Sequence, residues 1–291
     1  MSLAANILEG IIYGASLGML YVLVALGLTL IFGLMEVVNF AHGAFVTLGA
    51  YLGISFLDLT GNFWLSMVLA GVVVGVLGLA IERTLIRRLY GEEPIYQLLL
   101  TFGLALLLEG AVILTYGQDN QLLSAPALLQ GSPVPVGPAT VPQYRVFLIL
   151  FTGVLVAGIW LAIQRTKLGL IVKAGIEDRE RAQMIGVRLS RVNMLIMAVG
   201  AGLAAVSGFL SGPLLGVSPQ LGTGLLIVSF VIVVIGGLGN IRGTIISGLM
   251  IGILFSLTSF FYPSLANPVI YVAMAVVLLV RPEGLFGGVG S

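Results

Sequence analysis

The chain has 291 residues, of which 59% are hydrophobic and only 9% are charged, and its formal net charge is +1 at pH 7. Soluble domains usually carry about 25% charged residues, so the composition excludes an ordinary soluble protein, and the small net charge gives no electrostatic basis for binding nucleic acid. The absence of cysteine excludes disulfides and thiolate chemistry.

The apolar runs predict an all-α protein: a polytopic transmembrane helical bundle that forms one domain over residues 1–291. Lipid offers no partner to an unpaired peptide group, so spanning segments are expected to be helical. Nine stretches fit membrane passes, but some are short, and eight passes with one or two broken or re-entrant helices fit as well. In chain order the stretches are 8–33, 40–57, 63–81, 95–116, 144–163, 192–214, 223–238, 243–262 and 267–280.

The positive charges predict the orientation. Of the 13 Lys and Arg residues, all except Arg145 follow odd-numbered passes. Lys and Arg collect on the cytoplasmic side of membranes, which predicts an outer N-terminus and a cytoplasmic C-terminus. The segment 117–142 is then extracytoplasmic. It holds five of the 11 prolines, which predicts an extended loop that is either a connector or a docking surface for an outer partner.

The segment from Arg165 to Arg191 holds ten of the 25 formal charges and is predicted to be a cytoplasmic loop, 165–191. Within it, 174–190 is predicted to form a short helix whose acidic first turn complements the helix dipole and whose end is set by a glycine. An apolar patch of Ala182, Met184 and Ile185 suits a groove on a soluble partner; a solvated loop is the alternative. The candidate residues for contact with that partner are Glu177, Asp178, Arg179, Glu180, Arg181, Ala182 and Gly186.

The chemistry of an enzyme is missing. There is no phosphate-binding loop, the single histidine rules out a multi-histidine metal site, and no pass carries two carboxylates placed for acid–base work. We therefore expect a non-catalytic protein with no cofactor.

A substrate pathway is expected at helix breaks, since broken helices line the sites of many transporters. Polar elbows occur at 39–49 and 239–248, which are weakly similar and suggest distant repeats. One ionisable residue lies well inside a pass, where charge usually faces a cavity or a partner. A structural hydrogen bond or a packing role is the alternative for each candidate. The candidate pathway residues are Asn39, His42, Gly43, Glu109 and Asn240.

Two motifs are specific in combination: the elbow NFAHG, 39–43, and the loop GIEDRERAQMIG, 175–186. With them the chain resembles, over essentially its whole length, the permease subunits of ATP-binding-cassette importers of the branched-chain amino acid family. The one departure noted is Arg242, where an uncharged residue is common. The segments that carry the resemblance are GLTLIFGLMEVVNFAHGAFVTLGAYLG (27–53), TFGLALLLEG (101–110), RTKLGLIVKAGIEDRERAQMIGV (165–187), VIGGLGNIRGTIISG (234–248) and VRPEGLFG (280–287).

The resemblance implies a location in the bacterial inner (plasma) membrane and a set of partners. They are a second homologous permease subunit, two ATP-binding-cassette ATPase subunits that hydrolyse the ATP, and an extracytoplasmic substrate-binding protein. The stretch Glu177–Gly186 corresponds to the coupling helix that seats in an ATPase. Two alternatives stay open: the same architecture importing urea, short amides or other amino acids, and a standalone secondary carrier or channel.

Overall fold

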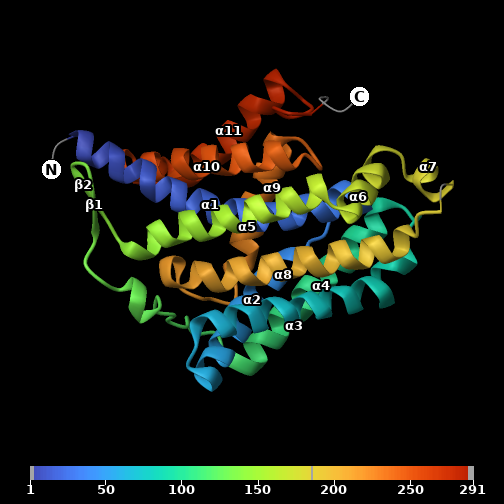
Figure 1. The fold of residues 1–291 in the computed structure, drawn as a ribbon, viewed down its shortest axis with the longest axis horizontal. Coiled ribbons are helices and arrows are strands. Elements are labelled where there is room, and N and C mark those ends of the chain that lie inside the picture. Colours follow the sequence, from blue (N-terminus) through green and yellow to red (C-terminus); the bar gives the residue numbers. More distant parts are fainter. Residues whose placement is uncertain (1–2, 185, 288–291) are drawn as a thin grey trace.

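The computed structural model describes residues 3–184 and 186–287, and within these the side chains of residues 176, 177, 179 and 180 are not described. This part of the chain is almost entirely helical (Figure 1), which confirms the predicted fold class. The α-helices are α1 (Leu3–Met35), α2 (Ala41–Thr60), α3 (Phe63–Thr84), α4 (Pro94–Tyr116), α5 (Gln143–Arg165), α6 (Lys167–Glu177), α7 (Arg179–Met184), α8 (Leu189–Leu215), α9 (Leu221–Gly236), α10 (Ile241–Phe261) and α11 (Ala266–Val280).

Short elements join the helices. Three are 3₁₀ turns: η1 (Ile86–Leu89), η2 (Ala127–Leu129) and η3 (Pro263–Leu265). Between α4 and α5, the strands β1 (Val134–Val136) and β2 (Ala139–Val141) form an antiparallel hairpin in which Pro135 pairs with Thr140. The segment predicted as an extended loop therefore contains an ordered hairpin.

Each of the nine predicted apolar stretches is a helix, and they are not equal in length. Eight helical segments in the described part are long and apolar enough to cross a membrane. The ninth, α9, has 16 residues and rises only about 24 Å at 1.5 Å per residue, less than the roughly 30 Å of hydrocarbon in a bilayer. The structure thus has eight candidate spans and one half-length apolar helix.

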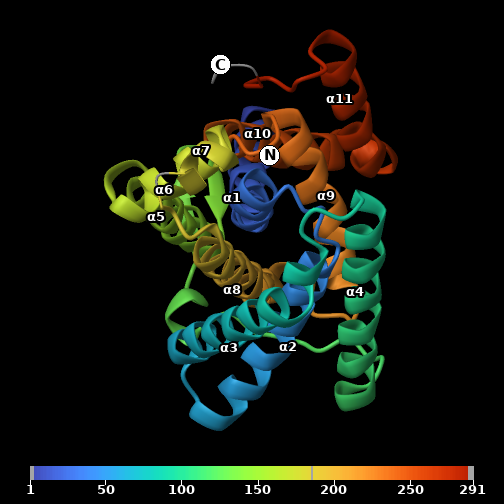
Figure 2. The ribbon, with the colours of Figure 1, turned by 90° about the vertical axis from the view of Figure 1, so that its right-hand side faces the viewer.

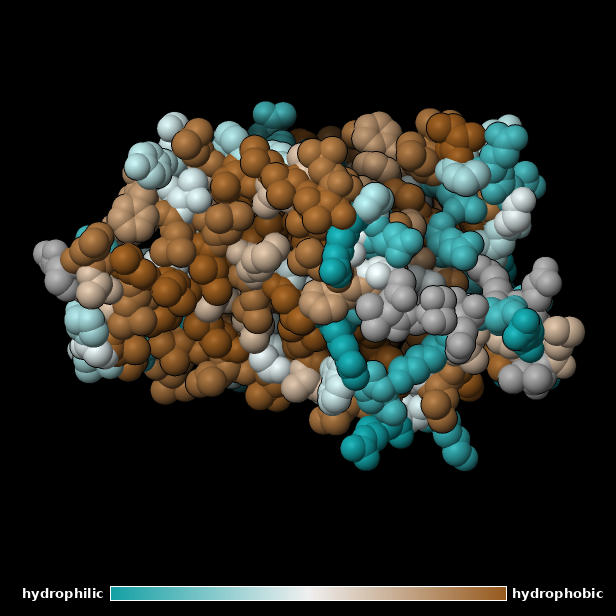
Figure 3. Space-filling view, turned by 90° about the horizontal axis from the view of Figure 1, so that it is seen from above, coloured by the Kyte–Doolittle hydropathy of each residue, from teal (hydrophilic) through white to brown (hydrophobic). Residues whose placement is uncertain are grey.

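Most helices lie along the longest dimension (Figure 1), and the two ends differ in hydropathy (Figure 3). The hairpin end carries the N-terminus with β1 and β2, and the α7 end carries α6 and α7. In Figure 3, hydrophobic side chains cover most of the surface toward the hairpin end, and hydrophilic ones gather toward the α7 end. At the hairpin end Arg145, in the first turn of α5, lies 4.0 Å over the Tyr13 ring and donates to Ser16 Oγ at 3.0 Å.

Small residues let the central helices approach each other closely. A Cβ added at Gly14 of α1 would lie 2.5 Å from the Cα of Ile253 on α10, and one added at Gly75 of α3 would lie 2.9 Å from the carbonyl oxygen of Ala198 on α8. The small-xxx-small spacings in this chain therefore pack helices of one subunit together.

Two helix–elbow–helix units have inverted directions. After α1 the chain turns back through 36–40 into α2, which runs toward the hairpin end; after α8 it turns back through 216–220 into α9, which runs toward the α7 end. Both turns start with a left-handed residue, Glu36 (φ 55°) and Gly216 (φ 73°). The partner of the first elbow is therefore 216–220. The repeat suggested by the weak similarity between 39–49 and 239–248 stays a prediction; these segments lead into α2, with 20 residues, and α10, with 21.

Candidate functional site

The first turns of α2 and α9 cross in the interior of the bundle. A Cβ added at Gly43 would lie 2.7 Å from the carbonyl oxygen of Gly222, and one added at Gly222 would overlap the Gly43 carbonyl. Thr47, one turn further along α2, secures the crossing: its Oγ1 accepts from the Gly222 N–H at 2.9 Å and donates to the Pro219 carbonyl at 3.3 Å. The two helices are thus held together by direct backbone contact.

A cavity of about 160 Å³ lies beside this crossing and is named here the Glu109 cavity. Its polar lining comes from Thr47 of α2, Glu109 of α4 and Thr223 of α9. No Lys, Arg or His is among its lining residues in the described part of the chain. The cavity therefore offers acceptor oxygens on mostly apolar walls.

A second cavity, of about 250 Å³, lies between the end of α1, the first elbow, α9 and α11, and is named here the apolar cavity. Phe40 and Leu226 line both cavities and so separate them. Figure 2 shows α4 and α11 on either side of α9, and these two helices contribute Glu109 to one cavity and Tyr271 to the other. Together they flank one face of the bundle, the α4–α11 face.

Three of the five predicted pathway residues belong to this face. Asn39 and Phe40 line the apolar cavity, while Gly43 and Glu109 line the Glu109 cavity. Asn39 is only 1% exposed; its amide donates to Met197 Sδ at 3.7 Å, and its Oδ1 has no hydrogen-bond partner among the described residues.

The other two predicted pathway residues line neither cavity. His42 is fully buried with its Nε2 3.0 Å from the Val24 carbonyl, and since that oxygen only accepts, Nε2 carries the proton. Asn240 caps α10: its Oδ1 accepts from the Gly243 N–H at 3.0 Å, and its amide donates to the Phe286 carbonyl at 2.9 Å. Both residues have a local packing or capping role, and a pathway role for them stays a prediction.

The charged loop is two helices, not the one predicted over 174–190. Asp178 interrupts it: Glu177 ends α6, and Asp178 caps α7 by accepting from the Arg181 N–H at 2.9 Å, with an ion pair to Arg181 Nε at 2.7 Å. A short acidic side chain at this position favours an N-cap over continued helix. Glu177 therefore lies at the end of a helix and not in an opening turn.

The C-terminus of α7 forms as predicted. Gly186 has φ 88°, its N–H donates to the Gln183 carbonyl, and the Val187 N–H donates to the Ala182 carbonyl, which is the Schellman pattern of helix ends. Met184 is 78% exposed, but Ala182 is 2% exposed and so faces the protein, contrary to the predicted apolar patch. The predicted contributions of Ile185 and of the Glu177, Arg179 and Glu180 side chains lie outside the described residues.

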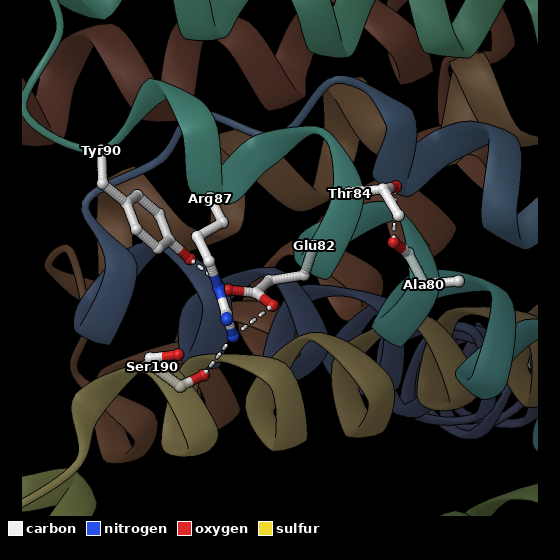
Figure 4. Close-up of polar contacts among 6 residues, drawn as sticks. All are labelled: Ala80, Glu82, Thr84, Arg87, Tyr90 and Ser190. Carbon is white, nitrogen blue, oxygen red and sulfur yellow. Dashed lines mark hydrogen bonds and ion pairs between the residues drawn. The ribbon is translucent and has the colours of Figure 1, made fainter.

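A polar cluster of Glu82, Arg87 and Tyr90, named here the Glu82 cluster, holds the start of α8, which follows α7 in the chain (Figure 4). Glu82 of α3 is fully buried; it accepts from Tyr90 Oη at 3.0 Å and pairs with Arg87 Nη2 at 3.4 Å. The same Nη2 donates to the carbonyl of Ser190, in the first turn of α8, at 3.2 Å. The cluster links α3 and η1 to α8. The cluster was not predicted, because Glu82 and Arg87 have the sequence pattern of solvent-exposed charges that follow the end of a membrane pass.

An apolar helical bundle with eight candidate spans, two inverted elbow units and cavities beside the helix breaks has the architecture of a polytopic membrane transporter. The chain belongs to the family of permease components of branched-chain amino acid transport systems, whose family model matches residues 10–280.

Relatives of this family match nearly the full chain. The chain is 32% identical to the high-affinity branched-chain amino acid transport system permease protein LivH of Escherichia coli K12, over 96% of this chain and 95% of the relative. It is 29% identical to the permease protein BraD of Pseudomonas aeruginosa, with the same coverage of both chains. A probable LivH of Methanocaldococcus jannaschii is 28% identical over 97% of this chain and 92% of its own length. No solved structure matches the chain significantly.

Proposed function

We propose that this chain is a transmembrane permease subunit of an ATP-driven ATP-binding-cassette importer for branched-chain or related neutral amino acids. The observation that carries the proposal is the capped helix α7, which projects at the charged end of a bundle that itself has no nucleotide-binding motif (Figure 1). The names of the relatives, which are branched-chain amino acid permeases, support the substrate class.

The pathway is proposed to form between this chain and a second, homologous permease. The α4–α11 face supports this pairing, since α4 and α11 carry many exposed large apolar side chains and both cavities lie beside them. A second permease with the same face would enclose the cavities between the subunits. An extracytoplasmic binding protein would deliver substrate at the hairpin end, to the segment 117–142.

The coupling is proposed to pass through α7 and the adjoining residues Asp178 and Gly186. Two ATPase subunits hydrolyse ATP, and one of them seats α7; when the pair closes, α7 moves with it as a short rigid element. The Glu82 cluster holds the start of α8 to α3, so displacement of α7 is passed to the bundle and opens the pathway to the other side.

The proposed orientation places the N-terminus outside and the C-terminus in the cytoplasm of the inner (plasma) membrane. Its support is the charge of the α7 end, where Arg83 ends α3, Arg165 ends α5 and Arg242 begins α10. Lys and Arg in such positions favour the cytoplasmic side.

The test is reconstitution of the chain with its second permease, ATPases and binding protein in liposomes. Gly186→Asp is expected to lower leucine-stimulated ATP hydrolysis and uptake about tenfold or more, because the left-handed φ disfavours the new side chain and the end of α7 is lost. Gly91→Asp is the matched control: Gly91 has the same φ of 88°, with open space for a Cβ, but belongs to the loop before α4.

Two results would reject the proposal. One is a purified chain that binds no ATPase together with normal uptake by Gly186→Asp. The other is transport by this chain alone, driven by an ion gradient, which would identify a secondary carrier. Uptake of urea or short amides in preference to leucine would keep the architecture and change the substrate class.

A further inference from the structure

Glu109 is a carboxylate without a partner inside a candidate membrane span. It lies well within α4 (Pro94–Tyr116), a helix that is long and apolar enough to cross the bilayer. Glu109 makes no hydrogen bond or ion pair with the described residues, whereas Thr101 on the same helix has three carbonyl acceptors within 3.2 Å. A charge placed at this depth is costly unless it faces a cavity or a partner.

The walls around Glu109 supply oxygen atoms and no positive charge. The hydroxyl-bearing side chains of Thr47 and Thr223 line the same cavity, and the rest of its lining is apolar, with Phe102 and Leu106 from α4 itself. Thr47 Oγ1 is already engaged at the helix crossing, while Thr223 is exposed in the first turn of α9. The complement to this lining is a small group that is positively charged and donates hydrogen bonds.

The neighbouring apolar cavity supplies the other half of a site. It is the larger of the two, at about 250 Å³ against about 160 Å³, and Phe40 and Leu226 line both cavities. Burial of methylene groups in such a cavity is favourable because it removes apolar surface from water. A molecule with an ammonium group next to a short aliphatic chain therefore matches both cavities at once.

We propose that Glu109 binds the ammonium group of the substrate in transit, while the aliphatic side chain of the substrate occupies the apolar cavity beyond Phe40 and Leu226. The proposal rests on the proposed transport function and deepens it. It assigns the substrate to the aliphatic α-amino acids and excludes urea and short uncharged amides, which have no cationic group to compensate Glu109.

The first experiment measures uptake and ATP hydrolysis separately in the reconstituted complex. Glu109→Gln keeps the shape of the side chain and removes its charge. It is expected to lower leucine uptake about tenfold, the loss of one charge-assisted hydrogen bond, while leucine-stimulated ATP hydrolysis stays within about twofold of wild type. Glu109→Asp keeps the charge and is expected to restore most of the uptake. Asp58→Asn, the same chemical change near the exposed end of α2, is the control and is expected to behave as wild type.

The second experiment asks directly what lies beside Glu109 in the wild-type complex. Dicyclohexylcarbodiimide reacts with membrane-embedded carboxyl groups, and its adduct on Glu109 is measured by mass spectrometry in the complex arrested during turnover. Leucine is expected to protect Glu109, and isocaproate, which has the same chain without the amino group, is not.

The outcomes separate the two proposals. Wild-type uptake by Glu109→Gln, or equal protection by leucine and isocaproate, overturns the assignment of Glu109 while leaving the importer intact. If Glu109→Gln does not assemble, the labelling of the wild-type complex decides, and absence of protection by leucine overturns the assignment. A wild-type complex that moves no amino acid refutes the proposed function itself.

Discussion

Two carboxylates on neighbouring parts of the bundle have opposite surroundings. Glu82 is fully buried, yet Arg87 and Tyr90 satisfy both of its oxygens. Glu109 is less buried and has no partner among the described residues, and it lines a cavity. Burial alone therefore does not distinguish a structural acid from a functional one. The hydrogen-bond partners of a carboxylate make this distinction. A paired buried carboxylate stabilises its surroundings, whereas an unpaired one is tolerated only where a ligand or solvent reaches it.

The largest expected effect tests this comparison on stability. Glu82→Ala removes the carboxylate that accepts from Tyr90 Oη and pairs with Arg87, and breaking a buried pair costs roughly 3 kcal/mol. Thermal unfolding in detergent, followed by helix content, should show a clear drop in Tm. Glu109→Ala removes no hydrogen bond or ion pair to the described residues and should leave Tm within a few degrees of wild type. A lower Tm for Glu109→Ala than for Glu82→Ala would contradict the comparison.

A smaller effect is expected where backbone contact, not charge, shapes the cavity. Gly222→Val forces a side chain into the Gly43 carbonyl, and overpacking of this kind costs about 1–3 kcal/mol. Gly224→Val, two residues along the same helix with nothing within 4 Å of an added Cβ, is the matched control. Uptake and Tm should fall together for Gly222→Val alone. Equal behaviour of the two variants would show that the crossing is not rigid.

The smallest effect is expected at the hydroxyl that secures the crossing. Thr47→Val keeps the shape of the side chain and removes the acceptor of the Gly222 N–H, which costs about 1 kcal/mol. Thr115→Val is the control, since its hydroxyl donates only to the Ala111 carbonyl of its own helix at 2.8 Å. Amide hydrogen exchange at the start of α9 should rise for Thr47→Val and stay unchanged for the control. Exchange that is the same in both variants would remove Thr47 from the architecture of the site.

Local patterns were sufficient to predict the helices and the way α7 ends. Long apolar runs have no stable state in lipid except as helices, so the fold class and the nine apolar helices, one of them short, follow from composition and spacing. Gly186 ends α7 because only a residue free of Cβ strain adopts its left-handed φ without cost. The break at Asp178 was missed, since the same acidic residue suits an N-cap and an opening turn alike.

Only the tertiary structure determined which residues of different helices contact each other. The tertiary structure pairs the elbow 36–40 with 216–220, buries His42 away from both cavities, and links Glu82 through Arg87 to the Ser190 carbonyl, and each of these joins different elements of the bundle. The inverted crossing of α2 and α9 depends on which glycines of two distant segments meet. The sequence pattern specifies how hydrophobic a segment is and how long its helix is. It does not specify which face of the helix is buried, because packing against neighbouring helices selects that face.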